Sequence, residues 1–249
     1  MSGVQARPVL RDVVAVRSRL SATTLATMVL AASIMEVACT SVSRQAGPSG
    51  AVGAPGPVEL KGGSVDEFAA QIKANSQRSD HEPDAKVRAD LATQASSAAD
   101  SCLALDPHAA ACLYGKALAI GMEARAHPTR ATGLLSGMLQ NLGNAESADP
   151  DYDKAGPSRV RALVLIRAPG WPLGPGDTDA GLAAARRAVS LQPDYPPNVL
   201  ALAEALSKTG DGKGAHDNYT HARDLAQALP SGPERDDWLR DAEDGLQHK

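Results

Sequence analysis

Cysteine, aromatic residues and long apolar runs are all scarce in this sequence. The 249 residues include three cysteines, two tryptophans, four tyrosines and one phenylalanine. Three cysteines are too few for a scaffold built from disulfides, and no apolar run reaches the roughly 20 residues of a permanent transmembrane helix. The formal net charge is −4, without a concentrated basic stretch. Proteins that bind nucleic acid carry such a basic surface, so we expect no nucleic acid among the partners.

The first 38 residues have the layout of an export signal. Four arginines precede an uncharged run from Leu20 to Met35, as in the basic and apolar regions of a signal peptide. Cys39 follows the small residue Ala38, which resembles a lipoprotein processing site where the cysteine sulfur accepts a lipid. We predict a signal peptide over residues 1–38 and lipidation of Cys39, on the periplasmic side of a bacterial membrane. Simple cleavage and a retained signal anchor are the alternatives.

The segment after Cys39 differs in composition from the rest of the chain. Residues 39–63 are rich in Gly, Pro, Ser and Ala and have neither helical nor alternating periodicity. Such a segment cannot bury enough apolar surface to offset the entropy lost when a chain becomes ordered. We therefore predict a flexible tether over residues 39–63 and an ordered domain over residues 64–249.

From Ser64 onward the pattern is helical and repetitive. Abundant Ala and Leu residues are interrupted at intervals by Pro and Gly, which indicates consecutive helices and no strands. Pro107, Pro150 and Pro193 each follow an Ala-rich segment, and both intervals between them (150 − 107 and 193 − 150) are 43 residues. A fixed period of this size is typical of stacked helix pairs.

The unit that begins near Pro196 is similar to the tetratricopeptide repeat. Tyr114 and Gly115 resemble the large and small pair that begins the first helix of an earlier unit. In the last unit, Leu202 and Ala203 match the large and small pair of the first helix, and Gly210 matches the turn. In the second helix, Ala215 and Ala222 match the small positions and Tyr219 matches the aromatic position. We predict an all-α fold, a tetratricopeptide-like solenoid of four to five antiparallel helix pairs with a closing helix from Glu234 to Gln247.

A proline- and glycine-rich insertion, Ala168–Asp177, separates the helices predicted over Pro157–Arg167 and Thr178–Leu191. Prolines on both sides of Trp171 order this segment, and pre-ordering lowers the entropy lost on binding. One interpretation is therefore a contact surface. The other is that Trp171 packs back onto the helices beside Tyr195, because large aromatic side chains are more often buried than exposed.

Cys102 and Cys112 lie ten residues apart on either side of a predicted turn between helices. An exported location permits oxidation, and we predict a disulfide between them. The alternative is that both are buried thiols that serve as small residues of the repeat.

The stretch from Ala155 to Asp211 resembles the T component of tripartite ATP-independent periplasmic (TRAP) transporters, a family of tetratricopeptide-repeat lipoproteins. The motifs that carry the resemblance are Arg167-Ala-Pro-Gly-Trp-Pro172 and the run from Pro193 to Leu206, and its specificity rests mainly on the first. The resemblance implies a membrane-tethered accessory protein that binds the solute-binding subunit of a secondary transporter, or the ligand of that subunit, through its helical-repeat surface. We assign to partner or ligand binding Pro169, Trp171, Pro172, Tyr195 and Asn198.

No catalytic constellation is present in the sequence. Gly210–Gly214 superficially resembles a phosphate-binding loop but lacks the Gly-Lys-Ser/Thr ending, and neither a nucleophile with its base nor zinc-ligand spacing occurs. We expect a non-enzymatic protein without cofactor or metal. The alternative function is a general cell-envelope tetratricopeptide scaffold or assembly lipoprotein, since such surfaces bind proteins more often than small molecules.

Overall fold

The computed structural model describes residues 63–247. The predicted signal peptide, the lipidation of Cys39 and all of the predicted tether except Gly63 lie outside this range. Within it the chain forms nine α-helices, one short 3-10 helix and no extended strand. None of these helices is long and apolar enough to cross a membrane. The helices are α2 (Val65–His81), α3 (Ala85–Leu105), α4 (Ala110–Ala126), η1 (Pro128–Arg130), α5 (Ala131–Ala148), α6 (Tyr152–Arg167), α7 (Thr178–Leu191), α8 (Pro196–Lys208), α9 (Gly212–Gln227) and α10 (Pro233–Gln247).

Local capping explains where the helices begin and end. Ser64 and Glu67 form a reciprocal capping box at the start of α2, in which each side chain accepts from the backbone N–H of the other residue. The Asp177 side chain accepts from the Ala180 N–H at 2.9 Å and begins α7. Helices α3, α5 and α7 each end two residues before one of the equally spaced prolines, because the residue before proline is driven out of the helical conformation.

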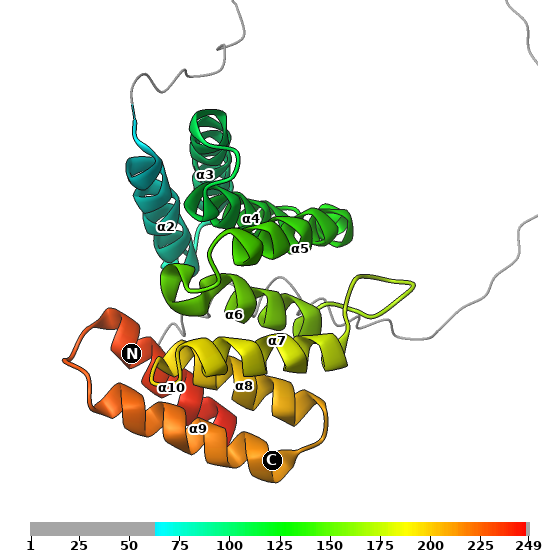
Figure 1. The fold of residues 1–249 in the computed structure, drawn as a ribbon, viewed down its shortest axis with the longest axis vertical. Coiled ribbons are helices and arrows are strands. Elements are labelled where there is room, and N and C mark those ends of the chain that lie inside the picture. The colour runs from blue at the N-terminus through cyan, green and yellow to red at the C-terminus, as the bar shows by residue number, and fades with distance from the viewer. Residues whose placement is uncertain (1–62, 248–249) are drawn as a thin grey trace, which may run out of the picture. The chain divides into compact units, whose positions relative to one another are not determined.

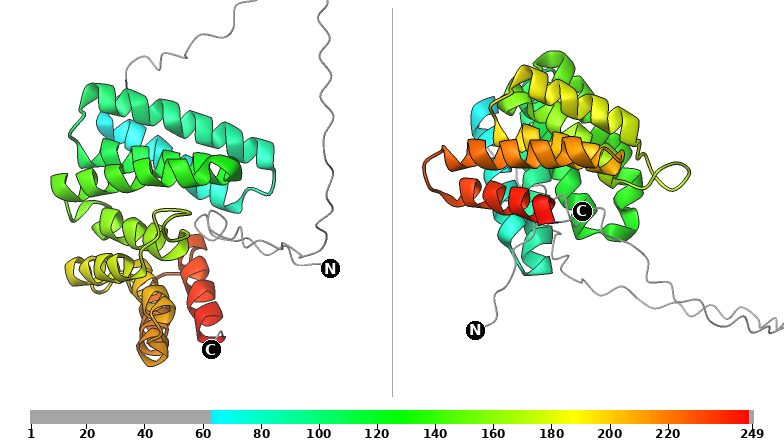
Figure 2. Two further views of the ribbon diagram at one scale, coloured as in Figure 1. Left: turned by 90° about the vertical axis from the view of Figure 1, so that its right-hand side faces the viewer. Right: turned by 90° about the horizontal axis from the view of Figure 1, so that it is seen from below.

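Consecutive helices pack as pairs, α2 with α3, α4 with α5, α6 with α7 and α8 with α9. The first helix of each pair also contacts the first helix of the next, so that α2, α4, α6 and α8 follow one another along one face (Figure 1). Helix α10 runs along α9 and also contacts α8 (Figure 2). The prediction of an all-α helical-repeat solenoid is confirmed, with four pairs and a closing helix in the part of the chain that the structure describes.

Small side chains allow the close approach of these helices. A Cβ atom at Gly115 of α4 would lie 2.8 Å from the Cδ1 atom of Ile72 in α2, so the contact between α2 and α4 depends on the missing side chain. Gly210, between α8 and α9, has a φ of 87°, a conformation that glycine adopts without steric cost. Of the other residues predicted to pack the repeat, Tyr114, Ala203, Ala215 and Ala222 are buried, whereas Leu202 and Tyr219 are half-buried.

Cys102 of α3 and Cys112 of α4 are joined in a disulfide, with a Cα–Cα distance of 5.3 Å. Because the bond closes a loop of about ten residues, restriction of the unfolded chain is worth about 3 kcal/mol. We expect intact-mass analysis with alkylation to find both thiols blocked until the protein is reduced, and reduction to lower the free energy of unfolding by about 3 kcal/mol. Alkylation of both thiols in the unfolded, unreduced protein would instead favour the buried-thiol alternative.

Candidate functional site

A cavity of about 500 Å³ lies along the face formed by the first helices of the pairs. Side chains of α2, α4, α6 and α8 line it, and α10 contributes a further wall. The volume is within the range of small-molecule sites in proteins, about 300–1,000 Å³. The face shared by the first helices is therefore the candidate site.

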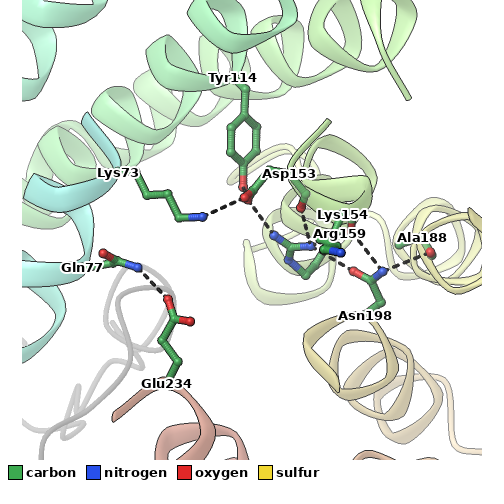
Figure 3. Close-up of polar contacts among 9 residues, drawn as sticks. All are labelled: Lys73, Gln77, Tyr114, Asp153, Lys154, Arg159, Ala188, Asn198 and Glu234. Atoms are coloured by element: carbon green, nitrogen blue, oxygen red, sulfur yellow. Dashed lines mark hydrogen bonds and ion pairs between the residues drawn. The ribbon is translucent and has the colours of Figure 1, made fainter. Parts of the chain in front are cut away.

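Asp153, at the start of α6, is the polar centre of the cavity wall (Figure 3). The Lys73 ammonium of α2 donates to its Oδ1 atom at 3.0 Å. The Tyr114 hydroxyl of α4 and the Nη2 atom of Arg159 each donate to its Oδ2 atom at 3.1 Å. The hydrogen bond to Asp153 raises the pKa of Lys73, whereas burial raises the pKa of Tyr114. One carboxylate thus connects the first helices of three consecutive pairs.

The backbone around Asp153 is strained. Asp153, Lys154 and Ala155 have φ values of 48°, 59° and 60°, and each non-glycine residue in the left-handed region costs about 1–3 kcal/mol. Regular helical geometry in α6 begins at the next residue, Gly156, one residue before the predicted start at Pro157. The surrounding side chains must therefore hold this turn in place.

Arg159 provides much of that support. Its side chain is only 10% exposed, and its Nη1 atom donates to the carbonyl oxygens of Asp153 and Lys154, at 3.3 and 3.0 Å, and to Asn198 Oδ1 at 3.0 Å. The guanidinium carbon also lies 5.2 Å from the centre of the Tyr195 ring, within cation–π distance. Arg159 therefore ties the strained turn to α8.

Asn198 is fully buried and does not line the cavity. Its amide group donates to the backbone carbonyls of Lys154, Ala188 and Gln192 at 3.1–3.2 Å, and its Oδ1 atom accepts from Arg159. All its polar atoms are thus engaged within the protein. From the sequence, Asn198 was predicted to bind a partner or ligand directly, and this geometry corrects that prediction. Asn198 instead positions Arg159 and the strained turn.

Tyr195, by contrast, lines the cavity. Its ring packs edge-on against Trp238 of α10, with ring centres 5.6 Å apart and an interplanar angle of 76°. Burial raises the pKa of its hydroxyl. The interpretation that Trp171 packs beside Tyr195 is therefore wrong, because Trp238, which is distant in sequence, occupies that position.

Trp171 lies instead on a loop that projects between α6 and α7 (Figure 1). Its side chain is 90% exposed and that of Leu173 is 72% exposed. Pro169 and Pro172 on the same loop are exposed as well. The residues predicted to bind a partner or ligand therefore do not form one site: three lie on the loop, Tyr195 lies in the cavity and Asn198 is buried.

Backbone hydrogen bonds close the loop at its base. The Gly176 N–H donates to the Pro169 carbonyl at 2.9 Å, and the Asp177 N–H donates to the Leu165 carbonyl at 3.0 Å. A side chain at Gly176 would overlap the Ala168 carbonyl. The two ends of the loop can therefore approach closely only because residue 176 is a glycine. The exposed Trp171 is thus carried on an ordered support.

Helix α10 is linked to α2 across the cavity by polar contacts. The Gln77 side chain donates to Glu234 Oε1 at 2.7 Å (Figure 3), and His81 Nε2 lies 3.3 Å from Asp237 Oδ2. The closing helix was predicted from the sequence, but its return to the first helix was not. Local periodicity carries no signal for a contact between residues 157 positions apart.

The cavity has the chemistry of a binding site. Arg167 donates two hydrogen bonds to the Glu204 carboxylate. Lys73 and Arg159 donate hydrogen bonds to Asp153. These bonds hold the three positively charged groups of the lining in place. Within residues 63–247, no three His, Cys, Asp or Glu side chains are arranged to hold a metal ion. Charge, hydrogen bonding and ring contact are the interactions that this lining offers to a ligand.

No protein-family model matches the chain, and no curated protein is similar enough to count as a match. Among solved structures, the fold is similar to that of a thermophilic tetratricopeptide-repeat protein of Thermus thermophilus. The two chains are 21% identical, with a TM-score of 0.49, and the match covers 74% of this chain and 92% of the other.

Proposed function

We propose that this chain is a non-enzymatic accessory protein of the cell envelope that binds the solute-binding subunit of a TRAP-type secondary transporter through the loop Ala168–Asp177. The exposure of Trp171 on that closed loop carries the proposal. Exposed apolar side chains that gather at one place mark contact sites, and tryptophan is enriched among the residues that dominate binding energy. The same loop contains most of the motif by which the chain resembles the T component.

The composition of the loop favours a protein partner with an apolar pocket. No charged residue occurs from Ala168 to Gly176, while Trp171 and Leu173 present the large apolar groups. Because the base of the loop is hydrogen-bonded and its ends continue into α6 and α7, little conformational entropy is lost when a partner binds. Burial of the Trp171 ring is therefore the main expected source of affinity.

Replacement of Trp171 by alanine is expected to weaken binding to the solute-binding subunit at least about 30-fold, the effect of losing a dominant contact of about 2 kcal/mol or more. The melting temperature should remain unchanged, because the side chain is 90% exposed. Titration calorimetry with the solute-binding protein encoded beside the transporter measures the affinity. Leu105→Ala is the matched control, since Leu105 is an exposed apolar residue (55%) at the end of α3.

Two outcomes oppose different parts of the proposal. Equal affinities of the wild-type and Trp171→Ala proteins would remove the loop from the interface. A pull-down from envelope extract that recovers assembly machinery and no solute-binding protein would favour the general envelope scaffold.

In a Trp238→Phe variant, Trp171 is the only tryptophan left, so protection of its fluorescence from acrylamide on complex formation reports the contact directly.

A further inference from the structure

The cavity on the first-helix face contains an aromatic wall that the docking role of the loop does not use. Tyr195, which directly precedes α8, Tyr219 of α9 and Trp238 of α10 all line it. The Tyr195 ring already lies against a cation, since the Arg159 guanidinium is 5.2 Å from its centre. Aromatic faces attract cations through the ring quadrupole, and desolvation strengthens this attraction. The wall therefore suits a positively charged group in a ligand.

Carboxylates outnumber cations in the same lining. Six acidic and three basic side chains line the cavity, and each of the three bases is bonded to an acid of the lining. The lining also includes Asp80 of α2 and three acids of α10, Glu234, Asp241 and Asp244. Asp80 has Arg125 of α4 as a partner at 3.5 Å. Burial raises the pKa of Asp80 to about 7, so the other five acids supply most of the negative charge, against three bases. Low-dielectric walls concentrate the resulting negative potential.

Helix α10 brings the acidic and aromatic groups together on one face. Glu234, Trp238, Asp241 and Gly245 occur at intervals of four, three and four residues, and all four line the cavity. This spacing places residues on the same side of a helix. Other helices contribute apolar groups to the lining, including Val160 and Leu163 of α6 and Leu200 of α8.

We propose that this cavity binds an organic cation, an ammonium or guanidinium group carried on an apolar body. The charged head lies between the carboxylates of α10 and the rings of Tyr195 and Trp238, and the body contacts Val160, Leu163 and Leu200. The head belongs either to a free small amine or to a Lys or Arg side chain of a protein segment. The residues involved are separate from the loop Ala168–Asp177, so the inference does not depend on the docking proposal.

Three probes of one shape and different charge test the proposal with the full-length purified protein. We expect benzylammonium to bind at least about tenfold more tightly than neutral benzyl alcohol at neutral pH, and benzoate to bind more weakly than either. Absence of saturable binding of benzylammonium up to about 10 mM, a limit that detects a dissociation constant of ~1 mM, would overturn the proposal. Equal binding of all three probes would also overturn it.

Two substitutions on α10 locate the binding. Glu234→Gln removes a lining charge but keeps an amide oxygen that can accept from Gln77, so we expect the affinity for benzylammonium to fall about fivefold or more. Glu243→Gln is the matched control, because Glu243 lies on the same helix, is exposed and does not line the cavity. Equal effects of the two substitutions would exclude binding at this place, and circular dichroism verifies that both variants fold.

A final pair of measurements identifies the source of the cation and keeps the two proposals apart. Tighter binding of a capped lysine tripeptide than of benzylammonium indicates a protein segment, whereas the reverse order indicates a free amine. Trp171→Ala is expected to leave benzylammonium binding unchanged, since Trp171 is not part of the lining. Loss of cation binding in that variant, with its fold intact, would contradict the assignment of the site to the cavity.

Discussion

Replacing Arg159 with methionine is expected to lower the free energy of unfolding by about 3–5 kcal/mol, the usual cost of removing one partner of a buried ion pair. Methionine fills much of the same volume but provides no donor. Asp153 and Asn198 would each lose a hydrogen bond to the guanidinium, as would the carbonyls of Asp153 and Lys154. Because those carbonyls belong to the strained turn, the turn is expected to relax and to separate α6 from α8.

Urea unfolding of matched variants measures this effect. Arg159→Lys keeps the charge but lacks the planar fork that bridges Asp153 and Asn198, so we expect an intermediate loss. Arg186→Met makes the same change at an exposed position of α7 and should alter the free energy of unfolding by less than about 0.5 kcal/mol. A loss below about 1 kcal/mol for Arg159→Met would show that other contacts suffice to hold the start of α6.

The second large effect concerns pH and Asp80. Burial raises the pKa of the Asp80 carboxyl from 3.8 to about 7, with the nearby Arg125 opposing and the Asp237 carboxylate of α10 reinforcing the increase. The folded protein therefore retains a proton that the unfolded chain releases above about pH 4. Since the folded state binds more protons in this window, the contribution of Asp80 to stability decreases as pH rises from about 4 to 7.

The Asp80→Asn variant isolates this contribution. Asparagine stays neutral at every pH, so the wild-type free energy of unfolding should decline relative to that of the variant between about pH 4 and 7. The pKa difference between 3.8 and about 7, at about 1.4 kcal/mol per pKa unit, sets an upper value of about 4 kcal/mol. Because the side chain is 25% exposed to water, the expected total change is on the order of 2–4 kcal/mol. Asp90→Asn, at an exposed position of α3, is the control. A difference profile that rises with pH would mean that Arg125 keeps Asp80 ionised.

Much of the helical framework was predictable because its signals are local. The prolines at positions 107, 150 and 193 end their helices through a steric effect on the preceding residue, and Asp177 caps α7 with its own side chain. The predicted helix Thr178–Leu191 has the observed bounds of α7. The 43-residue interval also predicted the pairing, because each pair buries its apolar surface against the next.

The candidate site was less predictable, since its members are selected by contacts between distant helices. Lys73, Asp153 and Arg159 occur at no recognisable spacing, and each is an ordinary charged residue of a helical protein. The only local sign was Asp153-Lys154-Ala155 before Pro157, which interrupts the helical pattern without revealing a left-handed turn. The usual burial of aromatic residues favours a core position for Trp171, yet the backbone hydrogen bonds of its loop keep it in solvent.

The sequence by itself determined that residues 64–247 are all-α, that helices end before Pro107, Pro150 and Pro193, and that consecutive helices form pairs. These properties depend on backbone conformation and on the spacing of small and apolar residues within 43 positions. Only the tertiary structure decided that α10 returns to α2 and that acidic and aromatic groups from distant helices line one cavity. Such contacts depend on the crossing angles between helices, which add up along the four packed pairs. No short stretch of sequence determines that total rotation.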